Sequence, residues 1–341
     1  MSAVHEAGWV SVIVPTYNRA SLLMEALESV RAQSYRPIEL VVVDDGSTDA
    51  TEDAVVRWPG ADGAGDWRLH YLRQRNAGAP AARNRGLASA RGEFVQYLDS
   101  DDTLGSGKVA AQVAALRAHP EWDVVAGDSF ELETGAQTEP RVPLTPESGL
   151  ARCITSWTLP VNNPLFRRRA CERIGPWDAG MRCFEDASYM ASIFCAGLVL
   201  GYVGGAPSYI RGHRATTGAE QGPRVSFRGE PQRAHDEVLA LYRHHCHVCA
   251  RFPADRRGVQ PYASALAKEG FRVARKLMQV GEGEKARELL DLHELASHSP
   301  RLRADRASLR ALARVVGERR AATWHERAYD WVHDLRRGGR R

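Results

Sequence analysis

The chain has 341 residues, of which 43% are hydrophobic and 26% are charged, a composition typical of folded globular proteins. Its formal net charge of +4 is too small to indicate a nucleic-acid-binding protein. No apolar run approaches the roughly 20 residues of a membrane-spanning helix, and the N-terminal residues MSAVHEAGWV lack the pattern of a signal peptide. The six cysteines are scattered, as is usual for reduced thiols. We therefore expect a cytoplasmic protein.

The N-terminal third of the chain alternates between strand and helix patterns. Short apolar segments rich in β-branched and aromatic residues predict strands at 10–14, 38–43, 69–72 and 94–98. Segments with helical spacing or helix-capping residues lie between them, at 16–33, 51–57 and 79–90. This alternation with short connections predicts an α/β fold, with a mostly parallel sheet and helices on both of its faces.

The remainder of the chain changes character near residue 225. Before that point the patterns predict a helix at 108–119, one strand in WDVVAGDSFEL (122–132), a helix in FEDASYMASIFCAG, and short strands at 198–203 and 207–210. Helical spacing dominates afterwards, including two antiparallel helices joined at Gly281–Gly283. We therefore expect two domains, 1–225 and 226–341, of which the second is a helical C-terminal domain.

Three polar motifs directly follow predicted strands. PTYN ends the first strand, DDGS the second and LDSDD the fourth. Ligands of open α/β sheets bind outside the carboxyl ends of the strands. We therefore expect these motifs to meet in one crevice. The first strand is followed neither by G-x-G-x-x-G nor by a P-loop, which disfavours dinucleotide-dependent dehydrogenases and P-loop kinases.

The LDSDD motif places Asp99, Asp101 and Asp102 within four residues. Clusters of carboxylates suit hard divalent cations such as Mg²⁺ or Mn²⁺ better than zinc. A turn followed by a helix cap uses the same residue types. Tyr17 can likewise stack on a base or be an ordinary strand-end aromatic, and the aspartates of DDGS can bind a base or ribose or form a turn. The residues alone leave these alternatives open.

Five ordered blocks, taken together, resemble the glycosyltransferases of family 2. They are VSVIVPTYNRASLLMEALESVRAQ, ELVVVDDGSTDAT, NAGAPAARNRGLASARGEFVQYLDSDD, NNPLFRR and FEDASYM, within residues 9 to 215. The resemblance implies a GT-A fold, with a Rossmann-like nucleotide-binding half and a mixed, mostly parallel sheet, to which the helical C-terminal part is appended. It covers none of the last third of the chain.

The resemblance also implies functional residues. LDSDD occupies the place of the family's D-x-D motif, so Asp101 is expected to bind Mn²⁺ or Mg²⁺, assisted by Asp99 or Asp102 and completed by His213. Arg83 is expected near the ribose or the phosphates. The residues expected to bind the nucleotide sugar are Pro15, Thr16, Tyr17, Asn18, Asp44, Asp45, Arg83, Asp99, Ser100 and Asp101.

The pair Glu185–Asp186 matches the family's acidic catalytic motif, in which we expect Asp186 to be the general base. One base opposite the leaving group inverts the anomeric centre. The chain lacks the Q-x-x-R-W motif and membrane spans of the processive members, so transfer of a single sugar is expected. Phe184 stands where a glycine is common in the family, and this departure affects what can be expected of acceptor binding. The donor base expected from the family is uracil, and the acceptor can be a glycan, a protein or a small molecule.

Two other functions remain as alternatives. A sugar-1-phosphate nucleotidyltransferase also uses an α/β nucleotide domain, but PTYNRAS does not supply its Gly-rich basic loop. A non-catalytic sugar- or nucleotide-binding protein is the other alternative. The C-terminal tail, with Trp324, Ala328, Trp331 and Leu335 on one helical face before several arginines, predicts a helix that docks on its own domain, forms a homodimer or lies on an anionic membrane surface.

Overall fold

The computed structural model describes residues 5–62, 65–138, 159–181, 185–211 and, with gaps at 272, 276, 288 and 289, residues 271–290. The chain separates into two compact units. The first consists of Met1–Gly149 and Ser156–Arg224, and the second of Leu150–Thr155 and Val225–Arg341. The predicted C-terminal tail helix lies outside the described residues. No helix among those described is long and apolar enough to cross a membrane.

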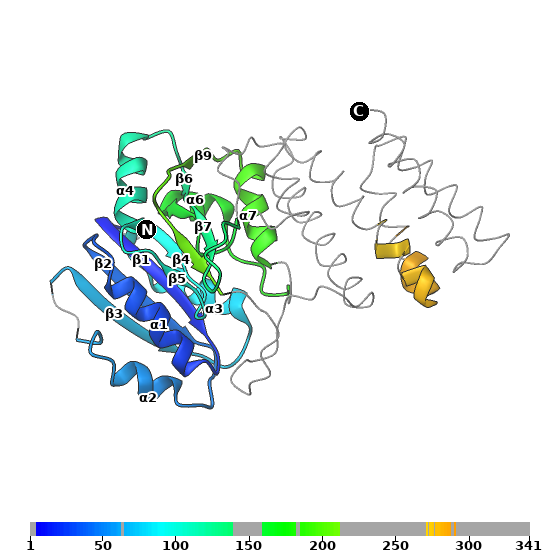
Figure 1. Ribbon diagram of the computed structural model, residues 1–341, viewed down its shortest axis with the longest axis horizontal. Helices are drawn as coiled ribbons and strands as arrows, with labels where there is room; N and C mark the ends of the chain where they lie inside the picture. Colours follow the sequence, from blue (N-terminus) through cyan, green and yellow to red (C-terminus); the bar gives the residue numbers. More distant parts are fainter. Residues whose placement is uncertain are drawn as a thin grey trace. The chain divides into compact units, whose positions relative to one another are not determined.

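A seven-stranded sheet with the order β3-β2-β1-β4-β8-β6-β9 forms the centre of the first unit (Figure 1). Its strands are β1 (Glu6–Thr16), β2 (Ile38–Asp44), β3 (Trp67–Arg73), β4 (Gly92–Tyr97), β6 (Val124–Ala126), β8 (Leu165–Arg167) and β9 (Leu200–Tyr202). Strands β3, β2, β1 and β4 are parallel to one another, as are β6 and β9, while β8 is antiparallel to both of its neighbours. The sheet is therefore mixed and mostly parallel, which confirms the predicted fold class.

Helices cover both faces of this sheet. The described helices of the first unit are α1 (Ala20–Arg31), α2 (Thr51–Val56), α3 (Ala79–Ser89), α4 (Lys108–Ala118), α6 (Arg168–Ile174) and α7 (Glu185–Cys195). The apolar stripe of α1 has the spacing of one helix face and consists of Leu23, Ala26, Leu27 and Val30, all fully buried. The predicted helices between the strands of the N-terminal half are thus confirmed.

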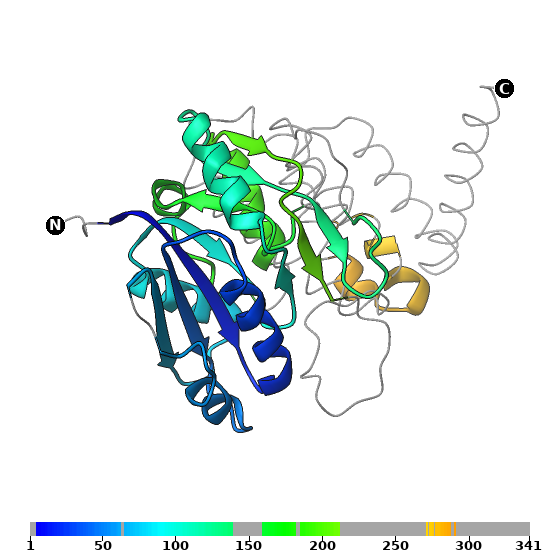
Figure 2. The ribbon, with the colours of Figure 1, turned by 60° about the vertical axis from the view of Figure 1, so that its left-hand side comes forward.

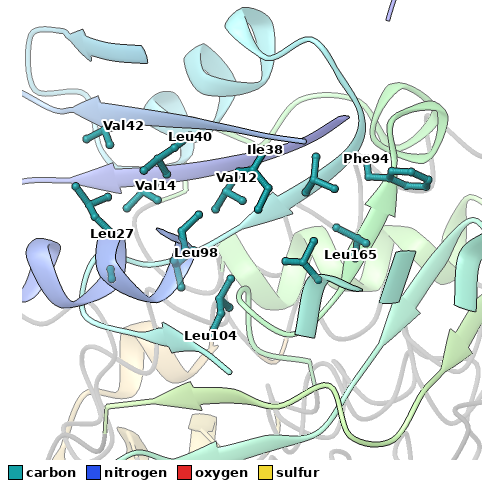
Figure 3. Packing of buried hydrophobic residues seen from close by; sticks show 14 of the residues in the cluster. Val12, Val14, Leu27, Ile38, Leu40, Val42, Phe94, Leu98, Leu104 and Leu165 are labelled. Atoms are coloured by element: carbon teal, nitrogen blue, oxygen red, sulfur yellow. The ribbon is translucent and has the colours of Figure 1, made fainter. Parts of the chain in front are cut away.

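The main core lies between the sheet and helices α1 and α4 (Figure 3). Val10, Val12 and Val14 of β1 point to this side because alternate residues of a strand face the same way. Leu27 of α1 and Leu98, which follows β4, belong to the same cluster. Intervening residues of the strands face α3 on the opposite side. This double burial explains why β1 and β2 consist of nearly continuous apolar runs.

The segment 122–132 was predicted as one strand, and this prediction is wrong. It forms β6 and then β7 (Ser129–Glu131), which pairs in a second sheet of order β5-β10-β7 with β5 (Thr103–Leu104) and β10 (Ser208–Ile210) (Figure 2). The break falls at Gly127, where a Cβ atom would lie 2.3 Å from the carbonyl oxygen of Ala206. The next residue, Asp128, accepts hydrogen bonds from the Tyr202 hydroxyl at 2.6 Å and the Gly205 N–H at 3.0 Å.

In the second unit, the described residues are helical on both sides of Gly281–Glu282. The Gly281 N–H donates to the carbonyl of Met278, and the Glu282 N–H donates to that of Leu277. Gly281 has φ +92°, so these bonds form a Schellman motif, which ends a helix with a left-handed residue. The helix break that the sequence places here is therefore present.

Substitution of Gly86 tests the contact between α3 and the sheet. A Cβ atom at this position would lie 2.4 Å from Cγ2 of Ile13. Alanine favours helices by about 1 kcal/mol over glycine, but overpacking costs about 1–3 kcal/mol, so we expect Gly86→Ala to lower the free energy of unfolding by up to about 2 kcal/mol. Urea denaturation measures this. Gly204→Ala in a turn, where a Cβ would meet only the Tyr202 hydroxyl at an ordinary contact distance of 3.8 Å, is the control and should leave stability nearly unchanged.

Candidate functional site

Strands β2, β1 and β4 are adjacent and parallel, and their carboxyl ends carry the three polar motifs. Thr16 at the end of β1 lies opposite Asp44 at the end of β2, and Ile13 of β1 lies opposite Tyr97 at the end of β4. The carbonyl oxygen of Thr16 accepts a hydrogen bond from the N–H of Asp45 at 2.8 Å. The structure therefore brings PTYN, DDGS and LDSDD to one edge of the sheet.

The loops after β1 and β2 are tied to each other. The Asn18 N–H donates to Ser47 Oγ at 2.9 Å, and the Thr48 N–H donates to Asn18 Oδ1 at 2.7 Å. Asn18 has φ +51°, a left-handed conformation that asparagine tolerates better than most residues. Pro15 and Thr16 are buried, whereas Tyr17 is 38% exposed and available to a ligand. Thr16 Oγ1 is buried without a hydrogen-bond partner among the described residues.

Asp44 and Asp45 are both buried, and other parts of the chain use their oxygens. Asp44 is fully buried and accepts hydrogen bonds from the Tyr71 hydroxyl at 2.5 Å and from the Ser47 N–H at 2.7 Å. Asp45 accepts from Gln74 Nε2 at 2.7 Å and also from two N–H groups just before α3, those of Ala77 and Gly78. In this geometry both carboxylates hold together the loops at this edge of the sheet.

Each carboxylate of LDSDD has a partner of its own. Asp99 Oδ1 lies 2.7 Å from Arg83 Nη2, and Asp101 Oδ2 lies 2.8 Å from Arg19 Nη1. Asp102 accepts hydrogen bonds from the Arg211 N–H at 2.9 Å and from Asn162 Nδ2 at 3.1 Å. Burial, together with the charges of Asp101 and Asp99, raises the pKa of Asp102 well above its usual value. The motif is therefore a concentration of negative charge that arginine side chains partly neutralise.

Arg83 joins the two acidic motifs. It comes from α3, and its side chain is 3% exposed. Besides the contact with Asp99, its Nη1 lies 3.5 Å from Glu185 Oε1. Burial by itself would lower the pKa of Arg83, but the charges of Asp99 and Glu185 raise it above its usual value. Residues from the end of β4 and the start of α7 thus share one buried guanidinium.

An aromatic stack supports this guanidinium. Arg83 Cζ lies 4.5 Å from the ring centre of Trp177, on which Tyr189 of α7 is stacked at 3.9 Å. Asn84 holds the Trp177 backbone with two hydrogen bonds of 2.8 Å, one to its N–H and one to its carbonyl. Tyr97 of β4 contacts the Trp177 ring edge to face. The positions of α3, β4 and α7 are therefore coupled at one place.

Asp186 lies beside Glu185 at the start of α7. Burial and the charge of Glu185 raise the pKa of Asp186 to about 7, although the Ala187 N–H and Arg83 favour the ionised form. The Ala187 N–H donates to Asp186 Oδ1 at 2.7 Å. A carboxyl group with a pKa near neutrality can accept a proton at physiological pH and release it again, as a general base must.

The expected metal site is only partly described. His213 lies outside the described residues, and Ser100 is buried within the LDSDD turn. Among the residues that are described, no three His, Cys, Asp or Glu side chains converge to hold a metal ion. Mg²⁺ and Mn²⁺ often use one or two carboxylates together with water and substrate phosphates. The all-oxygen set of LDSDD is compatible with that kind of site and does not form a preformed cage.

Three contributors to this site were not anticipated from the sequence. They are Arg19, Arg211 and Trp177, which contact Asp101, Asp102 and Arg83 respectively. Arg19 belongs to PTYNRAS, and its position directly after the first strand could have indicated that it lies near the other motifs at the strand ends. No local pattern indicates that Arg211 or Trp177 meets these partners, because both pairs are far apart in the sequence. Arg211 lies 109 residues from Asp102, and Trp177 lies 93 residues from Asn84, the neighbour of Arg83.

The chain belongs to glycosyl transferase family 2. The family model matches residues 11–192, more than half of the chain, and spans the end of β1, LDSDD and Glu185–Asp186. A glycosyltransferase of Nostoc sp., itself uncharacterized, is 31% identical over 176 residues, which are 50% of this chain and 54% of that protein. The glycosyltransferase GlyA of Streptococcus pneumoniae is 44% identical over 95 residues, 28% of this chain and 13% of that one. The matches therefore span less than two thirds of either relative.

Solved structures share the GT-A fold. S. aureus TarS 1-349 superposes with a TM-score of 0.69 at 20% identity, over 94% of this chain and 91% of that one. A complex of the same TarS fragment with UDP-GlcNAc gives 0.68. The mannosyltransferase PcManGT of Pyrobaculum calidifontis, solved with GDP-Man and Mn²⁺, gives 0.55 at 23% identity, over 93% of this chain and 84% of that one. At these identities the likeness establishes the fold alone.

Replacement of Arg83 tests whether it holds the two acidic motifs together. Arg83→Met keeps most of the side-chain volume but leaves Asp99 and Glu185 without their shared cation. Breaking a buried ion pair costs about 3–5 kcal/mol, and because Asp99 is partly exposed we expect about 3 kcal/mol of lost unfolding free energy, measured by urea denaturation. Arg85→Met on the exposed side of α3 is the control and should change stability by less than about 1 kcal/mol. Equal effects of the two variants would contradict the bridging role.

Proposed function

We propose that this protein is an inverting glycosyltransferase that moves a single sugar from a nucleotide diphosphate sugar, specifically a UDP-sugar, to an acceptor hydroxyl. Asp186 is the general base, and Asp101 is the chief protein ligand of Mn²⁺ or Mg²⁺. The proposal is supported above all by one observation. Asp99 and Glu185 come from motifs 86 residues apart, yet both contact Arg83, so the acidic pair lies beside the LDSDD turn.

The donor half of the proposal rests on the edge of the sheet where β1, β2 and β4 end side by side. Tyr17 is exposed there and offers an aromatic face to a base, and Thr16 Oγ1 is a hydrogen-bonding group with no partner among the described residues. The structural neighbour TarS has been solved with UDP and with UDP-GlcNAc, which favours uridine as the nucleoside. When bound at Asp101, a divalent cation supplies Lewis-acid stabilisation of the negative charge on the departing diphosphate.

The acceptor half rests on Asp186. The Ala187 N–H occupies one oxygen of this carboxylate and orients it. The other oxygen is then free to take the proton of the acceptor hydroxyl as the new glycosidic bond forms. Arg83 contacts both Asp99 and the adjacent Glu185, and this keeps the start of α7 beside the LDSDD turn. With a single base on the side opposite the leaving group, displacement inverts the configuration of the anomeric carbon.

Nucleotide binding is the first test of the donor site. The purified chain is unfolded thermally with UDP, GDP, dTDP or CDP, each with and without Mn²⁺. A ligand at a thousandfold excess over its Kd stabilises the folded state by about 4 kcal/mol, so a clear, metal-dependent rise in Tm is expected with UDP. Asp101→Asn should abolish the metal-dependent part. A rise with GDP alone would replace the proposed uridine, and no rise with any nucleotide would contradict the donor site.

The pH dependence of turnover tests the base. Only ionised Asp186 accepts a proton, so kcat/KM should fall as the pH drops through about 7 and be constant on the alkaline side of this step. Asp186→Asn should lower kcat by about 10²–10⁴-fold and remove the step, while the UDP-dependent rise in Tm persists. These quantities are measured as UDP release from candidate UDP-sugars.

Asp178→Asn is the matched control for this experiment, because Asp178 is an exposed aspartate ahead of the same acidic motif. Its Oδ1 accepts a hydrogen bond from the Gly180 N–H at 2.8 Å, and the amide oxygen of asparagine can keep that bond. The variant should leave both the pH step and kcat unchanged. If Asp178→Asn and Asp186→Asn behave alike, or if the step survives in Asp186→Asn, another group is the base.

A further inference from the structure

The guanidinium of Arg19 contacts the carboxylate to which the proposed metal ion would bind. Arg19 Nη1 lies 2.8 Å from Asp101 Oδ2, with side chains that are 26% and 11% exposed respectively. A divalent ion on Asp101 would have to share this carboxylate with a positive charge at hydrogen-bond distance. Two like charges on neighbouring oxygens of one carboxylate repel each other. The two cations are therefore competitors.

Arg19 is the arginine of this site that can most readily leave its carboxylate. The side chain of Arg83 is only 3% exposed and has a second carboxylate and an aromatic ring as partners. Arg211 reaches Asp102 through its backbone N–H, while its side chain binds the Asp101 carbonyl and Glu25. Asp101 is the one ion-pair partner found for Arg19 within the described parts of the chain.

The local structure does not require the Arg19 side chain. Arg19 is the N-cap residue of α1, but it makes no side-chain cap bond, and only its carbonyl oxygen takes part, by accepting from the Leu23 N–H. The first turn of α1 contains no acidic residue that would hold the guanidinium in place. Displacement of the side chain from Asp101 therefore breaks one partly exposed ion pair and leaves the helix start intact.

We propose that Arg19 is a positioning residue that sets the metal affinity of the site by competing with the divalent cation for Asp101. This inference rests on the proposed metal-dependent function. It implies that Asp101 binds Mn²⁺ more weakly than it would without the guanidinium of Arg19 beside it. Metal binding then requires the side chain of Arg19, which is 26% exposed, to move away from Asp101.

The test measures Mn²⁺ binding directly, by the electron paramagnetic resonance signal of free Mn²⁺ in titrations of the full chain without nucleotide. Arg19→Gln is expected to bind Mn²⁺ about three- to tenfold more tightly than the wild type, since a partly exposed pair and the repulsion between the cations both disappear. Arg19→Lys, which keeps the charge but not the planar fork, should lie between the two.

Two controls separate direct competition from a general effect of charge. Arg31→Gln removes an equal charge from the other end of α1, where Arg31 pairs with Glu28 at 2.8 Å, and should leave the Mn²⁺ affinity unchanged. In an Asp101→Asn background, Arg19→Gln should no longer tighten binding, because the carboxylate for which the cations compete has been removed.

Several results would overturn the inference. They are an unchanged or weaker affinity in Arg19→Gln, an equal gain in Arg31→Gln, a gain that persists with Asp101→Asn, or no Mn²⁺ binding by any variant. Thermal shifts with UDP on the same samples keep this result separate from the donor proposal. If Arg19→Gln tightens Mn²⁺ binding but no nucleotide raises Tm, the proposed donor site is wrong and the role of Arg19 stands. If UDP raises Tm but Arg19→Gln does not tighten Mn²⁺ binding, the donor site stands and the role of Arg19 is wrong.

Discussion

The burial of Arg83 is the constraint on which the candidate site depends. A guanidinium taken out of water costs several kcal/mol unless anions accompany it. Asp99 and Glu185 meet that need, and Trp177 covers the face of the guanidinium. These partners belong to the end of β4, the start of α7 and the segment before it. All three segments must therefore lie close enough to contact the single charge of Arg83. If any of these segments moved away, the guanidinium of Arg83 would be exposed to water or left buried without a partner.

The same principle explains the unusual sequence LDSDD. Three carboxylates within four residues repel one another, and the structure relieves this repulsion with Arg83 at Asp99, Arg19 at Asp101 and the Arg211 N–H at Asp102. These three partners differ in how firmly they are held. Arg83 is enclosed, whereas Arg19 lies at the accessible edge, so the site combines a permanent cation with a replaceable one. On the proposed metal-dependent function, this arrangement would let an acidic motif fold stably and still bind a ligand cation.

The fold was more predictable from the sequence than the site. β1 and β2 are apolar on both faces and α1 has a clear stripe, so local patterns were sufficient there. The prediction for 122–132 failed because Gly127 and Asp128 take their conformation from Ala206 and Tyr202, contacts about 75 residues away. The motif pattern predicts that Asp44 lies near the ligand. Only the structure reveals that its carboxylate accepts hydrogen bonds from the Tyr71 hydroxyl and the Ser47 N–H.

The bonds made by Asp44, Asp45 and Asn18 have a consequence for the thermodynamics of ligand binding. They fix the loops after β1 and β2, and the chain ahead of α3, while the protein folds. The conformational entropy of these loops is thus lost during folding and not when a ligand arrives. These loops are therefore ordered before a ligand binds, and the entropy change of association there should come mainly from released water and from the ligand itself.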